Sequence, residues 1–260
     1  MSHANATSPI EGISDEEWRL RLDLAALYRL VAHFRMTDLI YTHISVRIPG
    51  PEHHFLINQY GLLFDEMRAS DLVKIDINGN IVDQPNRDRK KVNPAGFTIH
   101  SAVHMARHDL QFVLHTHTAA GMAVSCQKDG LLPLTQLALK FYGRIAYHGY
   151  EGIALNLDER ERIIADLGTH NAMILRNHGL LVGGPSASQT WNWIYFLERA
   201  CQAQIAALSG GRELVIPPEE VRKTTEKQAN PEASSFVEHQ ELAWAACLRL
   251  ISRDPIPYNT

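Results

Sequence analysis

Apolar and polar residues follow two different periods along this chain, and each period predicts a different kind of element. Trp18, Leu22 and Ala25 recur at helical spacing at the start of a long apolar-periodic stretch. Ser14 and Glu17, just before them, have the spacing of a capping box. The pattern therefore predicts a first helix that begins at Ser14.

Short runs rich in β-forming residues follow this helix. They read ISVRI at 44–48, HFLI at 54–57 and LVKIDINGNIV at 72–82. The last run contains Asn78-Gly79 between two apolar stretches, which is a two-residue hairpin signal. This part of the chain is expected to form antiparallel strands.

The second half of the chain alternates helical and strand patterns. It predicts a helix after Pro94, a strand at 112–117, a helix at 118–126, a strand at 172–184 and a long helix from Ser186 to about Leu208. Helices before and after a mostly antiparallel sheet indicate an α/β fold with αβα layers and a central, mostly antiparallel sheet. One further helix is expected in the sequence SFVEHQELAWAACLRLIS at 235–252.

Length, composition and charge indicate how many domains the chain forms and which partners to expect. With 260 residues, 45% of them hydrophobic, the chain can bury one large core. We expect a disordered tail at 1–12, one domain at 13–210 and a C-terminal helical extension at 211–260. The net charge of −4 gives no basic surface for nucleic acid or an anionic membrane, and the basic run RDRKK at 87–91 is interpreted as a solvated loop.

The cysteines and the apolar runs indicate a cytoplasmic protein. Three widely spaced cysteines without a C-x-x-C pair suggest reduced thiols. No apolar run approaches the ~20 residues that a spanning helix needs, and no signal peptide is evident at the N-terminus.

Two histidines end the strand predicted at 112–117. His115 and His117 are two residues apart, so their imidazoles lie on the same face of the strand and can hold one metal ion. A hydrogen-bonded pair of histidines without metal is the alternative. His178 follows another strand and precedes a glycine, so a turn can place it in the same pocket. Three imidazoles suit zinc, with a fourth position left open, although other divalent transition metals fit the same ligands.

Other residues compete for chemical roles. His100 and His104 are four residues apart on the second helix but lack the Glu of an H-E-x-x-H motif, which favours packing or support of a metal ligand. Lys140 could in principle form a Schiff base, but a lysine in an amphipathic segment is more often a solvated head on an apolar stem.

Three stretches in this order resemble the class II aldolase/adducin family. They read NPAGFTIHSAVHMARHDLQFVLHTHTAAGMAVS, LPLTQLALKFYGRIAYHGYEG and MILRNHGLLVGG, and the resemblance extends from about Trp18 to Gly210. In enzymes of that family an H-x-H pair and a later N-H-G histidine bind zinc, and His115, His117 and His178 occupy those positions. The resemblance implies a central antiparallel sheet with helices on both sides. It also implies a homo-oligomer, commonly a cyclic tetramer, with active sites at subunit interfaces.

The chain departs from the sugar-phosphate aldolases of that family at two places. Their second helix follows a Ser-Ser-Glu run whose Glu serves as acid/base, whereas this chain has Pro94, Ala95 and Gly96. Their phosphate-gripping turn is rich in Gly, Asn and Ser, whereas Thr42 and His43 stand here. Adducin head domains, which these segments resemble more closely, also lack the catalytic Glu.

Two hypotheses of function follow. The first is a zinc-dependent lyase or isomerase that acts on a small hydroxy-carbonyl or carboxylate substrate, with the metal as Lewis acid. Its proton-transfer residue would be one of four candidates, namely Tyr60, His43, His100 and Tyr142. The second is a non-catalytic, adducin-like assembly or binding module whose histidines hold a structural or vestigial metal.

Overall fold

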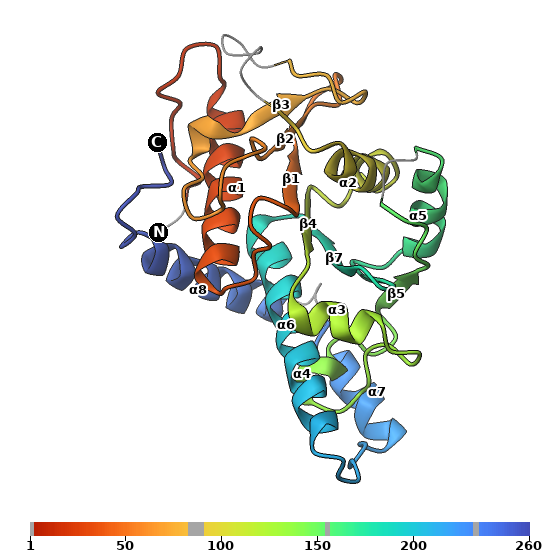
Figure 1. The fold of residues 1–260 in the computed structure, drawn as a ribbon. Helices are drawn as coiled ribbons and strands as arrows, with labels where there is room; N and C mark the ends of the chain where they lie inside the picture. The colour runs from red at the N-terminus through yellow and green to blue at the C-terminus, as the bar shows by residue number, and fades with distance from the viewer. Residues whose placement is uncertain (1–2, 83–90, 154–156, 231–233) are drawn as a thin grey trace.

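The computed structural model describes residues 3–82, 91–153, 157–230 and 234–260, which contain a seven-stranded sheet between layers of helices (Figure 1). The strand order is β3-β2-β1-β4-β7-β6-β5. All neighbours are antiparallel except β5 and β6, which are parallel. The strands are β1 (His43–Arg47), β2 (Phe55–Ile57), β3 (Val73–Ile75), β4 (Phe112–Thr116), β5 (Ile145–His148), β6 (Ala172–Leu175) and β7 (Gly179–Gly184). The expected αβα layering around a mostly antiparallel sheet is confirmed.

Helices cover both faces of the sheet, and Figure 1 shows α1 on one side and α2 with α5 on the other. The first layer contains α1 (Asp15–His33), α6 (Ala187–Ser209) and α8 (Ser234–Ile251). The second contains α2 (Pro94–Ala106) and α5 (Glu159–Leu167). The shorter helices are η1 (Ala69–Asp71), α3 (Ala119–Ser125), α4 (Gln136–Leu139) and α7 (Glu219–Gln228).

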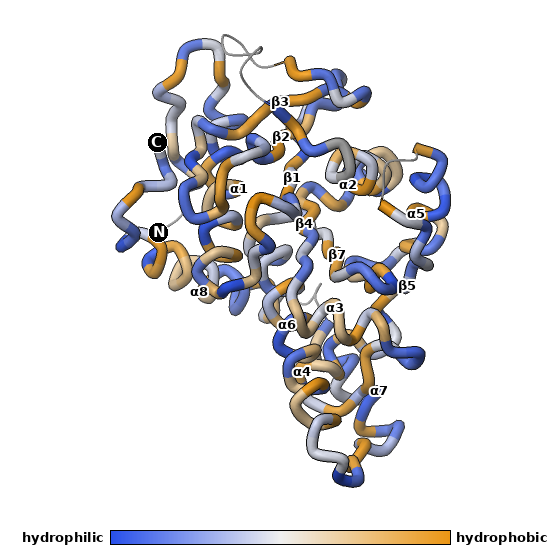
Figure 2. The backbone as a smooth tube through the Cα atoms, viewed as in Figure 1, coloured by the Kyte–Doolittle hydropathy of each residue, from blue (hydrophilic) through white to orange (hydrophobic). Residues whose placement is uncertain are grey.

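Alternation along β4 decides which layer each side chain meets. Leu114 packs in the core with α1 and α6, whereas Val113 packs in the core with α2 and α5. Because side chains two residues apart share a face, His115 lies on the α2 side of the sheet. Cross-strand register places His43 of β1 directly opposite His115. Figure 2 shows hydrophobic colouring along parts of β1 and β7 in the middle of the sheet.

The first helix begins where its sequence predicts. The Ser14 hydroxyl accepts a hydrogen bond from the Glu17 backbone N–H, which satisfies one free donor at the helix start. The Glu17 carboxylate binds Arg21 at 2.8 Å and Lys74 at 2.7 Å. The first ion pair is buried within α1, and the second ties the start of α1 to β3.

The segment 172–184 differs from its prediction as one strand. It forms two antiparallel strands, β6 and β7, with a tight turn between them. The turn occurs because Asn177 takes a positive φ of 55° and the His178 N–H bonds to the Leu175 carbonyl. Asn tolerates this left-handed conformation better than most residues.

The parallel pair β5 and β6 was not evident in the sequence. Strand β5 reads only IAYH, which is too short for a clear period. A parallel pair needs a crossover connection, and α5 lies between the two strands in the chain. The hairpin predicted at Asn78-Gly79 is confirmed, since Gly79 has a φ of +83° and Ile75 bridges to Ile81.

The two ends of the chain meet the domain. In the segment expected to be a disordered tail, the His3 imidazole contacts the Asp23 carboxylate at 2.7 Å and the Tyr258 hydroxyl at 2.9 Å. In the segment 211–260, Trp244 and Leu248 of α8 are buried in the core with α1 and α6. Of the run 87–91, only Lys91 lies within the described residues. None of the described helices is both long and apolar enough to cross a bilayer.

Candidate metal centre

The fold brings the three predicted histidines together. His115 is in β4, His117 directly follows β4, and His178 is in the turn between β6 and β7. Strand β7 pairs with β4 on one side and β6 on the other, so the three positions meet at one end of the sheet. The Nε2 atom of His117 lies 2.8 Å from Nε2 of His115 and 2.8 Å from Nε2 of His178.

The neighbours of two of these imidazoles determine where their protons sit. His115 Nδ1 is 2.8 Å from the Leu180 carbonyl, and a carbonyl only accepts, so Nδ1 carries the proton. His117 Nδ1 is 3.0 Å from a carboxylate oxygen of Asp38, which likewise accepts. In the neutral forms both Nε2 atoms are then bare, and two lone pairs face each other at 2.8 Å. A cation that accepts both lone pairs fits this arrangement, and such supporting acceptors are usual behind metal-binding histidines.

Burial keeps the imidazoles of His115 and His178 neutral, as metal ligation requires. Desolvation, reinforced by the neighbouring histidines, holds the pKa of His115 well below its ordinary value. Desolvation, then His117 and His148, lowers the pKa of His178 to about 4. Nitrogen lone pairs are therefore available at neutral pH without loss of a proton. Within the described residues, this is the one group of three or more His, Cys, Asp or Glu side chains close enough to share an ion.

A cavity of about 400 Å³ opens beside the three histidines. Two of the four proposed proton-transfer residues, Tyr60 and His43, line it. His100 lies behind His43 and does not line the cavity, while Tyr142 stacks under the Arg222 guanidinium of α7 at 5.2 Å. The structure therefore brings Tyr60 and His43 to the histidines and places Tyr142 elsewhere.

The cavity also contains residues that the sequence did not propose for a chemical role. Asp38 supports His117, and Tyr150 meets the His178 ring with centroids 6.4 Å apart. Thr42 lines the cavity with a φ of +68°, which is a strained conformation for a β-branched residue. Its buried hydroxyl has no partner among the described residues. The sequence pointed to Thr42 only as part of Thr42-His43, which departs from the Gly-Asn of the family's phosphate-binding turn. No pattern in the sequence pointed to Asp38.

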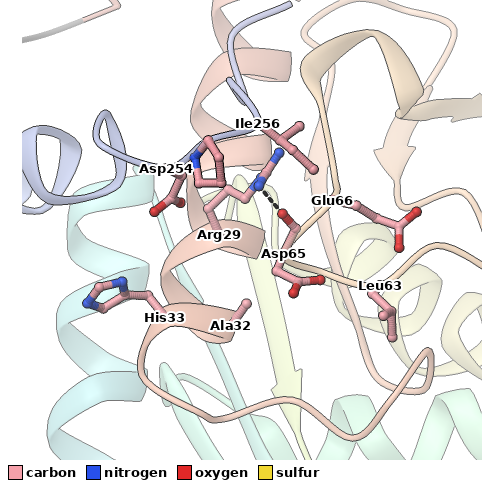
Figure 3. Close-up of a pocket in the computed structure, with 9 residues that line it drawn as sticks. Arg29, Ala32, His33, Leu63, Asp65, Glu66, Asp254 and Ile256 are labelled. Atoms are coloured by element: carbon pink, nitrogen blue, oxygen red, sulfur yellow. Dashed lines mark hydrogen bonds between the residues drawn. The ribbon is translucent and has the colours of Figure 1, made fainter.

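A second cavity of about 390 Å³ lies between α1, residues 63–66 and the C-terminal segment (Figure 3). There the Arg29 guanidinium donates to the backbone carbonyls of Asp65 and Met67. Figure 3 shows the carboxyl groups of Asp65, Glu66 and Asp254 turned in different directions. Their side chains do not converge on one point, so this cavity offers no ligand set comparable to the three histidines.

Comparison with known proteins agrees with the fold. The family model for the class II aldolase and adducin N-terminal domain matches residues 22–205. The chain belongs to the class II aldolase and adducin family. The match spans the whole sheet and all three histidines, so the family resemblance is confirmed.

Relatives within this family include both enzymes and adducins. The crystal structure of an aldolase II superfamily protein from Pseudomonas syringae is 55% identical, with a TM-score of 0.88, over 95% of this chain and 98% of that one. An L-fuculose 1-phosphate aldolase from Glaciozyma antarctica is 29% identical, with a TM-score of 0.80, over 95% and 96% of the two chains. Rat α-adducin is 44% identical over 76% of this chain, but the match covers only 27% of that longer protein.

Gly96, which the sequence resemblance aligns with the Glu of the sugar-phosphate aldolases, lies in α2 directly against His43. A Cβ built on Gly96 would lie 2.5 Å from Cδ2 and 2.8 Å from Cγ of His43. Real Cβ atoms essentially never come this close to another heavy atom. The imidazole of His43 therefore fills the space in which a side chain at position 96 would begin.

His43 is the first member of a buried hydrogen-bonded row. Its Nδ1 lies 2.7 Å from Nε2 of His100, and His100 Nδ1 lies 2.5 Å from the Ser45 hydroxyl. The same hydroxyl lies 2.7 Å from Nε2 of His104. The i, i+4 histidines of α2 thus contact His43 and Ser45 and lie outside the cluster.

This buried row predicts acid sensitivity. Desolvation, then Arg47, lowers the pKa of His104 to about 3, below its unfolded value near 6.5. Between these values the unfolded chain binds a proton that the folded chain does not, so stability falls as pH decreases from about 6.5 toward 3. The slope per group is about 1.4 kcal/mol per pH unit.

Urea unfolding at pH 7.0, 6.0 and 5.0 measures this effect. His104→Gln, which does not titrate, should lower the overall stability but give a shallower decline with acid than the wild type. Equal declines in both proteins would show that folding does not lower the pKa of His104.

Proposed function

We propose that the chain is a metal-dependent lyase or isomerase that acts on a small hydroxy-carbonyl or carboxylate substrate. His115, His117 and His178 would hold zinc or another divalent transition metal. The observation that carries this proposal is the meeting of bare Nε2 atoms, with protons held on the opposite nitrogens by Leu180 and Asp38. Such a metal, when bound, supplies Lewis acidity toward a substrate oxygen.

His43 is the strongest of the proposed proton-transfer residues. It lines the cavity, its ring lies 5.2 Å from the His115 ring, and His100 holds its Nδ1. Burial lowers its pKa well below the ordinary value, so at pH 7 the ring is neutral and carries a lone pair that can accept a proton. Tyr60 lines the same cavity and is the second choice. The missing carboxylate at position 96 would thus be replaced by an imidazole in nearly the same space.

The rim of the cavity supports a homo-oligomer, and the family resemblance favours a tetramer. Leu39 is 69% exposed and Ile153 is 75% exposed, and the aromatic rings of Tyr41 and Tyr150 are exposed beside them. Apolar side chains gathered around one opening are typical of a protein interface. We propose that a neighbouring subunit covers this rim and closes the site. A small-molecule substrate and other copies of the chain would then be its partners, in the cytoplasm, without nucleic acid or membrane.

An alternative function is a non-catalytic, adducin-like assembly or binding module. The 44% identity to rat α-adducin and the glycine at position 96 favour it. Elemental analysis followed by a screen of small hydroxy acids for retro-aldol or decarboxylation products separates the two. About one metal ion per chain with turnover of any such compound supports the enzyme. Bound metal without turnover across the screen supports the module.

Phosphorylated sugars are expected to be poor substrates. Among the described residues that line the cavity there is no Lys or Arg, so no side chain there neutralises a phosphate. We expect turnover of L-fuculose 1-phosphate or ribulose 5-phosphate to be barely above background under conditions in which an unphosphorylated hydroxy acid reacts. Coupled assays of aldehyde or ketose formation measure this. Efficient cleavage or epimerisation of either phosphate would contradict the prediction.

A further inference from the structure

A cavity of about 530 Å³ between α6 and α8 shares no lining residue with the cavity beside the histidines. We name it the aromatic cavity because five aromatic side chains line it: Phe34, Trp191, Tyr195, Phe196 and Phe236. Three of these rings pack against one another, with centroids of Phe34 and Trp191 5.4 Å apart and of Phe34 and Tyr195 5.2 Å apart. The wall is therefore built of flat, closely packed apolar faces.

Lys140 brings a positive charge into this apolar wall. Its Nζ lies 3.5 Å from the centre of the Phe196 ring and 5.7 Å from that of Phe236. No carboxylate within the described part of the chain forms an ion pair with it. Burial lowers its pKa, which shows that the ammonium has lost part of its water. A partly buried ammonium without a paired carboxylate costs free energy, which a bound anion would lower.

Gln240 adds an unsatisfied amide to the same cavity. The residue is only 3% exposed, and neither its Nε2 nor its Oε1 has a hydrogen-bond partner in the described residues. A buried amide without partners costs free energy that a bound group can recover. The last torsion of a glutamine is soft, so the amide can turn toward a ligand without moving α8.

We infer that the aromatic cavity binds a planar aromatic carboxylate that also carries an amide or hydroxyl group. The flat rings stack on an aromatic ligand, Lys140 pairs with its carboxylate, and Gln240 supplies one donor and one acceptor to its polar group. The volume lies in the range of sites for small molecules. This inference is independent of the proposed metal chemistry, because the two cavities have no lining residue in common.

Calorimetric titration of the metal-loaded full-length protein with 4-carbamoylbenzoate tests the inference. Terephthalamide removes the charge from this probe, and trans-4-carbamoylcyclohexanecarboxylate removes its flat ring. We expect the aromatic carboxylate to bind at least about tenfold more tightly than either analogue, since each lacks one of the matched interactions. Equal affinity for all three compounds would overturn the inference.

Two substitutions locate the probe. Lys140→Met keeps the apolar stem but removes the charge, and Gln240→Met keeps the length but removes the amide. Each should weaken binding of 4-carbamoylbenzoate by about tenfold or more. Lys128→Met, which removes an exposed lysine outside this cavity, should leave affinity unchanged.

Two other results would overturn the proposal. Binding that is lost when a chelator removes the metal, but unaffected by Lys140→Met, would place the probe at the histidine cluster. Light scattering that shows the wild type to be larger than both variants, together with no probe binding to any of them, would show that a second copy of the chain covers the cavity.

Discussion

Replacing His115, His117 or His178 with alanine should remove most of the metal that the purified protein carries. Each substitution deletes one arm of a three-ligand site, and the remaining two imidazoles do not hold a divalent ion tightly. Inductively coupled plasma mass spectrometry of the purified variants, expressed as metal per chain, measures the loss. Circular dichroism should show that the sheet remains folded, because the site lies at one end of it.

Two further variants test whether the loss of metal follows from the contacts of the site. Asp38→Asn removes the carboxylate behind His117 and should weaken metal affinity by about 10–100-fold, less than loss of a ligand. His53→Ala is the matched control, since His53 is an exposed histidine outside the cluster. If the wild type carries no metal and takes up none, or if the triple alanine variant binds metal as the wild type does, the proposed site is wrong.

A side chain at position 96 should be destabilising, because it would collide with His43. An alanine in a helix ordinarily gains about 1 kcal/mol over glycine. At Gly96, however, the added Cβ would approach Cδ2 of His43 to 2.5 Å, and overpacking of this kind costs about 1–3 kcal/mol. We therefore expect Gly96→Ala to be destabilising. Gly96→Glu should also displace His43 and abolish any activity found for the wild type, while the metal content stays near that of the wild type.

Gly210→Ala provides the control for these substitutions. Its Cβ would meet only the Arg212 side chain at 4.0 Å, so it should change stability little. Urea unfolding and turnover of the same substrate compare the three variants. If Gly96→Glu leaves turnover and ligand affinity as in the wild type, position 96 does not face the site, and its alignment with the family's catalytic Glu must be abandoned.

The sequence alone predicted the layering and the pair of histidines at the end of β4 that the structure brings to one site. The spacing of His115 and His117 in a β-patterned run places both imidazoles on one face, because side chains alternate along a strand. Ser14 and Glu17 determined the start of α1 through local capping, and Asn78-Gly79 determined a hairpin through backbone conformation. These features depend on residues close in the chain, so their physical causes can be read from local spacing.

Only the tertiary structure decided how the site is supported. Asp38 lies 79 residues from His117 in the chain, and no local pattern links the two. The contact between Gly96 and His43 depends on how α2 packs on β1, and the short strand β5 depends on its parallel partner β6. Such contacts join residues distant in sequence, and their geometry arises from packing of whole elements rather than from any local periodicity.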